Sequence, residues 1–154
     1  MYEPARLNSH IVEKLYCEAL VLSDEVRSAF ALSGRIEDAG TRDDVAGVAL
    51  SCEALRTTTR MMHATAWLLN RRAYFMGELS EFQLRRYGRL AGDLPGSDPG
   101  HLELLDSEVC GLIAETERFY ARLVRLDRSW HRPDASQPSA IERLRERLAN
   151  QLSR

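Results

Sequence analysis

The histidines come first among the residues that could do chemistry, because two of them at helical spacing can hold a metal ion. They are His10, His63, His101 and His131. No two lie four residues apart, and no glutamate lies three residues before any of them. This excludes the H-E-x-x-H signature of zinc enzymes and the E-x-x-H signature of di-iron helical bundles. Asp98 lies three residues before His101, but the two straddle an expected helix start, so we predict no metal site.

The three cysteines are Cys17, Cys52 and Cys110. They are widely spaced, odd in number and form no C-x-x-C pair, which argues against a disulfide framework and a zinc site. No histidine lies near any of them in sequence, so we expect them to be small buried side chains rather than nucleophiles. Phosphate-binding loops, nucleophile elbows and dinucleotide-binding turns are also absent from the sequence. We therefore predict a protein that is not an enzyme and needs no cofactor.

Composition places the chain among ordinary globular proteins. It has 154 residues, of which 44% are hydrophobic and 29% charged, with a net charge of −2. No apolar run approaches the ~18 residues that span a bilayer, and the N-terminus lacks the pattern of an export signal. We expect a cytoplasmic protein that binds neither membranes nor nucleic acid. Residues 85–89 (RRYGR) mix basic and aromatic side chains as single-strand binders do, but a solvated helix face is the favoured interpretation.

Apolar residues spaced by three and four predict the long helices that would position these side chains. The first runs over residues 9–33, with Gly34 as its stop, and the second over residues 43–76, with Gly77 as its stop. The second repeats this spacing over five heptads, which we take as the seam of a bundle. The members of the seam are Val45, Val48, Cys52, Leu55, Thr59, Met62, Ala66, Leu69, Ala73 and Met76.

Turn and cap signals divide the rest of the chain. Residues 80–83 (SEFQ) match a capping box and predict a short helix over residues 80–91. Residues 92–100 are rich in glycine and proline and break the chain, after which Asp98 and Pro99 suit the start of a helix. A third long apolar series runs from Leu102 to Trp130. No run of residues has the alternation of a strand.

The predicted fold is all-α. It is an antiparallel three-helix bundle with long helices, a short fourth helix after the central one, and an amphipathic C-terminal segment. Residues 1–130 form the bundle domain, and residues 131–154 form a linker and a short helix that either docks on the body or folds on a partner. The tail residues that would bind a partner share one face, and they are Ile141, Leu144, Leu148 and Leu152.

Residues 61–76 are apolar on nearly every side of the central helix, so one neighbouring helix would not cover them. Either the short helix from residue 80 folds back over them, or a second copy of the chain covers them; the two are compatible. Because large apolar patches usually mark interfaces, we predict a homodimer. The candidate interface residues are Met61, Trp67, Leu68, Tyr74, Phe75, Phe82 and Tyr87.

Several stretches resemble one known family. Residues 52–62 (CEALRTTTRMM), 66–69 (AWLL), 72–73 (RA) and 77–80 (GELS) are similar to the central helix of the RcdA family, the alphaproteobacterial regulators of CtrA degradation. Residues 107–128 resemble the last core helix of that family. The E-x-L-R-x-T-T-R-x-M block is fairly specific, and the C-terminal tail matches less well.

The resemblance implies a non-enzymatic adaptor, a dimer of three-helix bundles that helps the ClpXP protease degrade cell-cycle and transcription regulators. In that family the adaptor joins a protease primed by CpdR, a response-regulator-like protein, and carries protein cargo to it. Tethering raises the local concentration of cargo at the unfoldase without any covalent step. The alternative is a stand-alone helical regulator that binds one signalling or transcription partner and takes no part in proteolysis.

Overall fold

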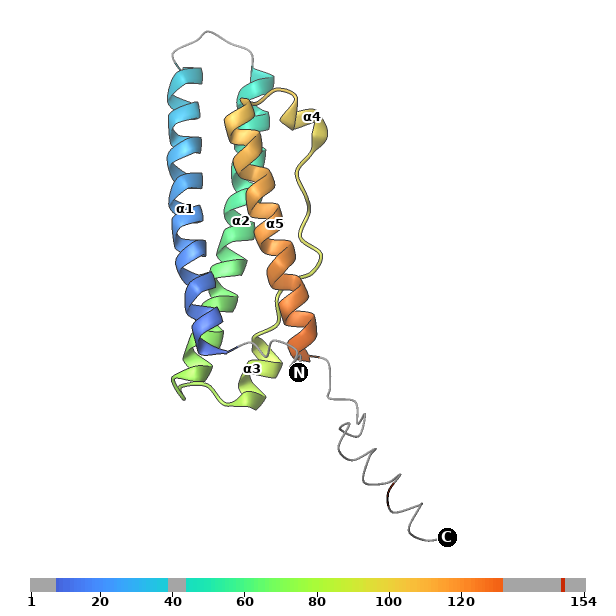
Figure 1. Ribbon diagram of the computed structural model, residues 1–154. Coiled ribbons are helices and arrows are strands. Elements are labelled where there is room, and N and C mark those ends of the chain that lie inside the picture. Colours follow the sequence, from blue (N-terminus) through green and yellow to red (C-terminus); the bar gives the residue numbers. More distant parts are fainter. Residues whose placement is uncertain (1–7, 39–43, 132–147, 149–154) are drawn as a thin grey trace.

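Five helices follow one another in the computed structural model, which describes residues 8–38, 44–131 and Leu148 (Figure 1). Their bounds are α1 Ser9–Asp38, α2 Asp44–Phe75, α3 Glu81–Tyr87, α4 Pro99–Leu102 and α5 Ser107–His131. The described residues contain no strand, so the prediction of an all-α protein is confirmed. No helix among them is long and apolar enough to cross a membrane.

The three long helices α1, α2 and α5 lie side by side, but they do not all alternate in direction (Figure 1). Arg72 near the end of α2 pairs with Glu13 near the start of α1, so these two helices are antiparallel. Arg60 of α2 contacts Thr116 of α5, and Trp67 contacts Asp127 a little further along both helices. α2 and α5 are therefore parallel, and the expectation of an antiparallel arrangement throughout is wrong for this pair.

A long connection makes the parallel pair of helices possible. After α3, residues 88–98 run back along α2 and α5 to the end of the molecule where α2 began (Figure 1). We call this segment the strap. α4 then precedes α5, which runs down the molecule beside α2. The glycine- and proline-rich break predicted from the sequence is thus a return crossing.

Local signals set several helix ends where the sequence placed them, but α3 ends at Tyr87 rather than at residue 91, and the series from Leu102 is divided between α4 and α5. Ser80 and Gln83 form the predicted capping box of α3, with both side-chain-to-backbone bonds present. Asp98 caps α4, whose first residue is Pro99. Gly77 adopts a φ of +79° just beyond α2, as a helix stop requires. Gly34 does not act as a stop, because α1 continues to Asp38.

The core forms where the three long helices meet. α1 and α5 bury the faces that their apolar spacing predicted, with Leu15, Leu22 and Leu123 among the buried residues. Thr116 is fully buried and donates its hydroxyl to the carbonyl of Ile113, one turn earlier. Of the predicted tail face, Ile141, Leu144 and Leu152 lie outside the described residues, and Leu148 is exposed.

Candidate protein-binding surface

The predicted seam of α2 lies on the outside of the chain. Leu55 is 70% exposed and Met62 66%, and Val45, Val48 and Leu69 are exposed as well. The expectation that this seam forms the core of the bundle is therefore wrong. The buried face of α2 lies on the opposite side, and its members are Ala49, Leu50, Glu53, Thr57, Arg60, Met61, Ala64, Trp67, Leu68 and Arg71.

α2 exposes apolar side chains and buries charged ones, which is the reverse of an ordinary surface helix. Between residues 45 and 70, none of its exposed positions carries Asp, Glu, Lys or Arg. The exposed residues are Val45, Val48, Ser51, Leu55, Thr58, Met62, His63, Ala66 and Leu69. We name the apolar members Val45, Val48, Leu55, Met62, Ala66 and Leu69 the α2 stripe. A continuous apolar face of this kind is a candidate surface for binding another molecule.

A groove deepens the α2 stripe on the side that faces α1. It has a volume of about 630 Å³ and a mainly apolar lining. Val26 and Phe30 line it from α1, and Met62, Ala66 and Leu69 line it from the stripe. The stripe and the groove together form one apolar surface shared by two helices.

Three of the predicted interface residues belong to the core of the same chain. Met61 is 4% exposed, Trp67 2% and Leu68 fully buried. Met61 and Trp67 pack in the cluster formed with α1 and α5, including Leu15 and Phe119. The prediction that these three side chains lie on a free surface is therefore wrong. These three apolar residues fall outside the predicted seam because they belong to the face of α2 that is actually buried.

The other four predicted interface residues lie near the end of α2 and on α3. Tyr74 and Phe75 form an edge-to-face cluster with Trp130 of α5, with ring centroids between 5.3 and 6.2 Å apart. Phe82 and Tyr87 of α3 are 70% and 72% exposed. Since α3 buries only Leu84, it does not cover residues 61–76 with these two aromatic rings.

The inward-facing charges of α2 bind α5 and the strap. The Arg71 Nη2 donates to an Asp127 oxygen at 2.9 Å, and the Trp67 indole donates to the same oxygen at 2.8 Å. The Arg71 guanidinium lies over the rings of Trp67 and Trp130, at 4.7 and 5.1 Å from their centroids. Burial lowers the pKa of Arg71, and Asp127 offsets only part of that effect. This charge pair is thus enclosed by aromatic rings.

Glu53 makes a second buried polar centre nearer the start of α2. Its Oε1 accepts from the Arg56 guanidinium at 2.6 Å and from the Asp98 amide at 3.1 Å, and lies 3.1 Å from His101 Nδ1. Burial acts to raise the pKa of this carboxyl, but the hydrogen bonds from Asp98, His101 and Arg56 outweigh it and hold the pKa below its usual value. Glu53 therefore joins α2 to the strap and α4.

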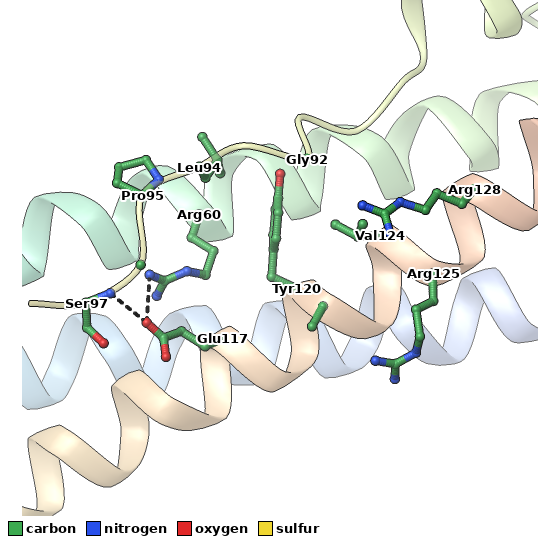
Figure 2. A pocket seen from close by; sticks show the side chains of 12 residues that line it. Arg60, Gly92, Leu94, Pro95, Ser97, Glu117, Tyr120, Val124, Arg125 and Arg128 are labelled. Atoms are coloured by element: carbon green, nitrogen blue, oxygen red, sulfur yellow. Dashed lines mark hydrogen bonds and ion pairs between the residues drawn. The ribbon is translucent and has the colours of Figure 1, made fainter.

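The strap lies against buried polar groups along its length. Gly88 O accepts from Arg71, the Leu90 amide donates to Asp127, and the Tyr120 hydroxyl donates to the carbonyl of Ala91. Further along, Glu117 accepts from the Ser97 amide at 2.8 Å and from the Arg60 guanidinium at 3.3 Å (Figure 2). The charged residues inside the bundle thus serve as anchors for the strap.

A second hollow lies between the strap and α5. It has a volume of about 550 Å³, and Figure 2 shows Tyr120 rising beside the strap, with Arg60 and Glu117 on one side and Arg128 on the other. Burial raises the pKa of the Tyr120 phenol to about 12, against a smaller opposing effect of Arg60. Arg60 and Glu117, which line the same hollow, are paired with each other. This arrangement positions the strap and presents no paired nucleophile and base.

Metal-ligating side chains do not gather within the described parts of the chain. No group of three or more His, Cys, Asp or Glu residues there is arranged to hold an ion. Cys110 donates its thiol to the carbonyl of Leu102, and Cys52 is partly exposed beside the α2 stripe. Cys17 is exposed, so the expectation that all three cysteines are buried is wrong.

Sequence reasoning missed Glu53, Arg60, Arg71 and Asp127 as buried anchors. The signal that would have found them is their position on α2 and α5. The three α2 charges share a face with Ala64, Trp67 and Leu68, whereas the competing face carries no charge at all. In a long helix, an uncharged apolar face and an opposite face that mixes tryptophan with arginine both have the composition of a contact surface.

The comparisons with known proteins give one match. A protein family described as protein of unknown function (DUF1465) matches residues 4–152. No curated protein and no solved structure matches the chain.

Proposed function

We propose that this chain, which belongs to the DUF1465 family, is a cytoplasmic, non-enzymatic adaptor that assists regulated proteolysis by ClpXP. It tethers protein cargo, including cell-cycle and transcription regulators, to a protease primed by a CpdR-like response regulator. Two kinds of support stand behind this proposal. The central-helix residues resemble the RcdA adaptors, and the fold presents a large surface suited to binding proteins.

The observation that carries the protein-binding part is the uncharged α2 stripe. α2 has 32 residues, so at about 1.5 Å per residue it is roughly 48 Å long. The strict heptad spacing along it is the pattern by which two long helices pack side by side. A second copy of the chain offers the same spacing and the same uncharged face. In our proposal two copies pair through the α2 stripe and the adjoining groove, which makes the adaptor a homodimer.

Pairing along the α2 stripe gives the adaptor its means of tethering. A dimer presents every other surface of the chain twice, so that one copy can hold the protease complex while the other holds cargo. Two weak contacts joined in this way bind far more tightly than either alone. The paired inward charges of α2 are engaged within each chain and are not needed for pairing.

The test of the adaptor role is reconstitution with its proposed partners. We expect the purified chain to associate with ClpX in the presence of the CpdR-like response regulator. We also expect cells that lack the chain to show longer half-lives for a small set of proteins, measured across the proteome by pulse-chase mass spectrometry. Re-expression of the wild-type chain should restore those half-lives.

Two results would count against this function. One is the absence of association with ClpX, the priming factor and the stabilised proteins in every combination. The other is a set of unchanged protein half-lives together with altered transcription, which would favour a stand-alone regulator that binds one signalling or transcription partner.

The C-terminal segment is a separate part of the proposal. In the sequence, Leu144 and Leu148 share an apolar face that suits a partner-binding arm. Replacing both with Asp should abolish cargo or partner binding and leave the melting temperature nearly unchanged. A large fall in the melting temperature would instead place the segment in the core of the protein.

A further inference from the structure

Helix α3 displays two aromatic rings that no other described part of the chain covers. Phe82 is 70% exposed and Tyr87 72%, while the only residue that α3 buries is Leu84. Phe82 and Tyr87 are five positions apart, about 140° around the helix axis, so the two exposed rings lie on either side of Arg86 on the outer part of α3. Aromatic side chains of this kind contribute most of the binding energy in many protein interfaces.

Several contacts hold α3 firmly despite its exposure. The Ser80 and Gln83 capping box fixes its start. At its end, Gly88 packs so closely that a Cβ there would lie 2.5 Å from the carbonyl oxygen of Leu84. The buried Arg71 donates to the carbonyl of Gly88. The two rings are therefore presented on a fixed helix, and a partner that binds them does not have to order it first.

Two arginines that have no ion pair within the described parts of the chain lie next to Tyr87 in the sequence. Arg86 lies over Tyr87 at 5.5 Å from the ring centroid, and Arg89 is exposed just past the end of α3. The last turns of α5, which lie at the same end of the molecule as α3, add Arg125 and Arg128 on the surface (Figure 1). This end of the protein is consequently rich in positive charge.

The opposite charge is concentrated elsewhere along the chain. Residues 90–117 contain seven acidic residues and no Lys or Arg, whereas residues 71–89 contain five Arg and two Glu. α4 and the start of α5 lie at the far end of the molecule from α3 (Figure 1). Of those five arginines, Arg71, Arg72 and Arg85 are paired with carboxylates, so Arg86 and Arg89 are the ones that the α3 end offers to acidic molecules.

We infer that the α3 end is a docking surface for an acidic segment of a partner protein. Separate apolar side chains of that segment pack on Phe82 and on Tyr87, and its carboxylates pair with Arg86 and Arg89. This inference deepens the proposed function, on which it rests for the identity of the partner as cargo or priming factor. The docking surface lies on α3, beyond the end of α2. The proposed pairing surface is the α2 stripe, which is a different part of the molecule.

The charges around α3 favour a protein over a single-stranded nucleic acid. Glu78 and Glu81 flank the rings, and Arg85 is already paired with Glu81 at 2.6 Å. A phosphate backbone would meet these two carboxylates as well as the arginines. A peptide can place its few acidic side chains beside Arg86 and Arg89 and avoid the glutamates.

The experiment pans a phage library of random peptides, about twelve residues long, on the immobilised full-length chain. The counter-target is the Phe82→Ser/Tyr87→Ser variant, whose two positions are exposed. We expect peptides that combine Asp or Glu with Leu, Ile or Phe to be enriched at least about tenfold on the wild type, the loss expected for removal of an interface hot spot. Equal enrichment on both targets, or enrichment of basic peptides, would overturn the inference.

A second measurement uses the most enriched peptide, labelled with fluorescein, in an anisotropy titration. Arg86→Glu/Arg89→Glu should weaken its binding at least about tenfold, and added salt should weaken the binding to wild type. The control Arg118→Glu reverses the charge of an exposed arginine on α5, away from α3, and should have little effect. Tighter binding of a twelve-nucleotide oligo(dT) than of the peptide would assign the surface to nucleic acid and overturn the inference.

The two proposals fail separately. A stripe variant, Leu55→Glu/Met62→Glu, should still bind the peptide through α3. If the stripe variant loses peptide binding while the α3 variants retain it, the inference is wrong and the adaptor function stands. If α3 binds acidic peptides but the chain never associates with ClpX or its priming factor, the inference stands and the proposed function is wrong.

Discussion

The Arg71 guanidinium and the Asp127 carboxylate form an ion pair of 2.9 Å inside the molecule, with side chains that are 0% and 8% exposed. The same carboxylate accepts from Trp67 and from the Leu90 amide. One residue of α5 thereby joins the inner face of α2 to the strap. The strap is the connection that lets α5 run parallel to α2. The Arg71–Asp127 ion pair therefore helps to hold the connection on which this topology depends.

Removal of Arg71 should destabilise the fold strongly. Arg71→Met leaves the buried Asp127 carboxylate without the Arg71 guanidinium, so that the His131 ring, at 3.2 Å, is the basic group left beside it. Breaking a buried pair in this way costs about 3–5 kcal/mol of unfolding free energy. Urea denaturation measures the change. The neighbouring Arg72→Met is the matched control, since its pair with Glu13 is on the surface and its loss should change stability little. Equal effects of the two substitutions would show that the buried pair has no special role.

The double variant Arg71→Met/Asp127→Asn separates the charge from the packing. Asn keeps one oxygen to accept from Trp67 or Leu90 but needs no buried cation. We expect the double variant to be more stable than Arg71→Met alone, which the same denaturation experiment would show. A double variant that is less stable than the single one would mean that the carboxylate acts mainly through its bonds to Trp67 and the strap.

Glu53 should make the fold sensitive to acid. Its pKa in the folded protein lies below the usual value of 4.5, because hydrogen bonds to the charged form outweigh its burial. A group whose pKa falls on folding stabilises the protein fully above its unfolded pKa, and this contribution is lost as the pH falls through the folded pKa. Between pH 7 and pH 3.5, the stability difference between wild type and Glu53→Gln should therefore shrink.

Urea denaturation at both pH values tests this expectation about Glu53. Glu81→Gln provides a control, because Glu81 is an exposed carboxyl paired with Arg85. It should show little pH-dependent difference from the wild type. A difference for Glu53→Gln that stays constant down to pH 3.5 would contradict the assigned role of its charge.

Tyr120 should ionise only at strongly alkaline pH. Burial raises its pKa to about 12, from an unfolded value near 10. A pKa that rises on folding gives stability that is present below pH 10 and is lost as the pH climbs toward 12. Absorbance near 295 nm reports phenolate formation, and Tyr120→Phe should remove a step of the titration at about pH 12. A titration in which Tyr120→Phe removes a step near pH 10 would contradict this assignment.

The spacing of apolar residues and the cap signals predicted the long helices. They did not predict which side of α2 faces inward. Spacing by three and four identifies an apolar face, and α1 and α5 each have one such face, so the prediction was right for them. α2 has two. The regular face from Val45 to Leu69 was the more obvious because it contains no charge, whereas the buried face mixes Trp67 and Leu68 with Arg60 and Arg71. Pairing of those arginines with Thr116, Glu117 and Asp127, far along the chain, is what makes their burial tolerable.

The direction of α5 was equally hidden from sequence reasoning. A break rich in glycine and proline reads as a turn between antiparallel neighbours. Here residues 88–98 instead cross the molecule, and their backbone groups are satisfied by Arg71, Tyr120, Asp127, Glu117 and Glu53. Such side-chain-to-backbone bonds join residues 17 to 45 positions apart, and no local pattern indicates them.

The oligomeric state of the protein tests whether a second copy covers the α2 stripe. If two copies pair through the stripe, light scattering should give twice the 17.5 kDa mass of one chain. Leu55→Glu/Met62→Glu should reduce the mass to that of a single chain, because the new carboxylates would be buried at the centre of the interface without partners. Both residues are exposed within one chain, at 70% and 66%, so the far-ultraviolet circular dichroism should be unchanged.

Val21→Glu provides the matched control, since Val21 is 61% exposed on α1 and lies outside the stripe and its groove. It adds one carboxylate to an apolar surface position and should leave the dimer mass unchanged. A stripe variant that keeps the dimer mass would show that the copies pair elsewhere. A wild-type chain that scatters as a single copy at micromolar concentration would mean that the stripe meets a different protein, and the heptad spacing would then describe a site for a long helix of that partner.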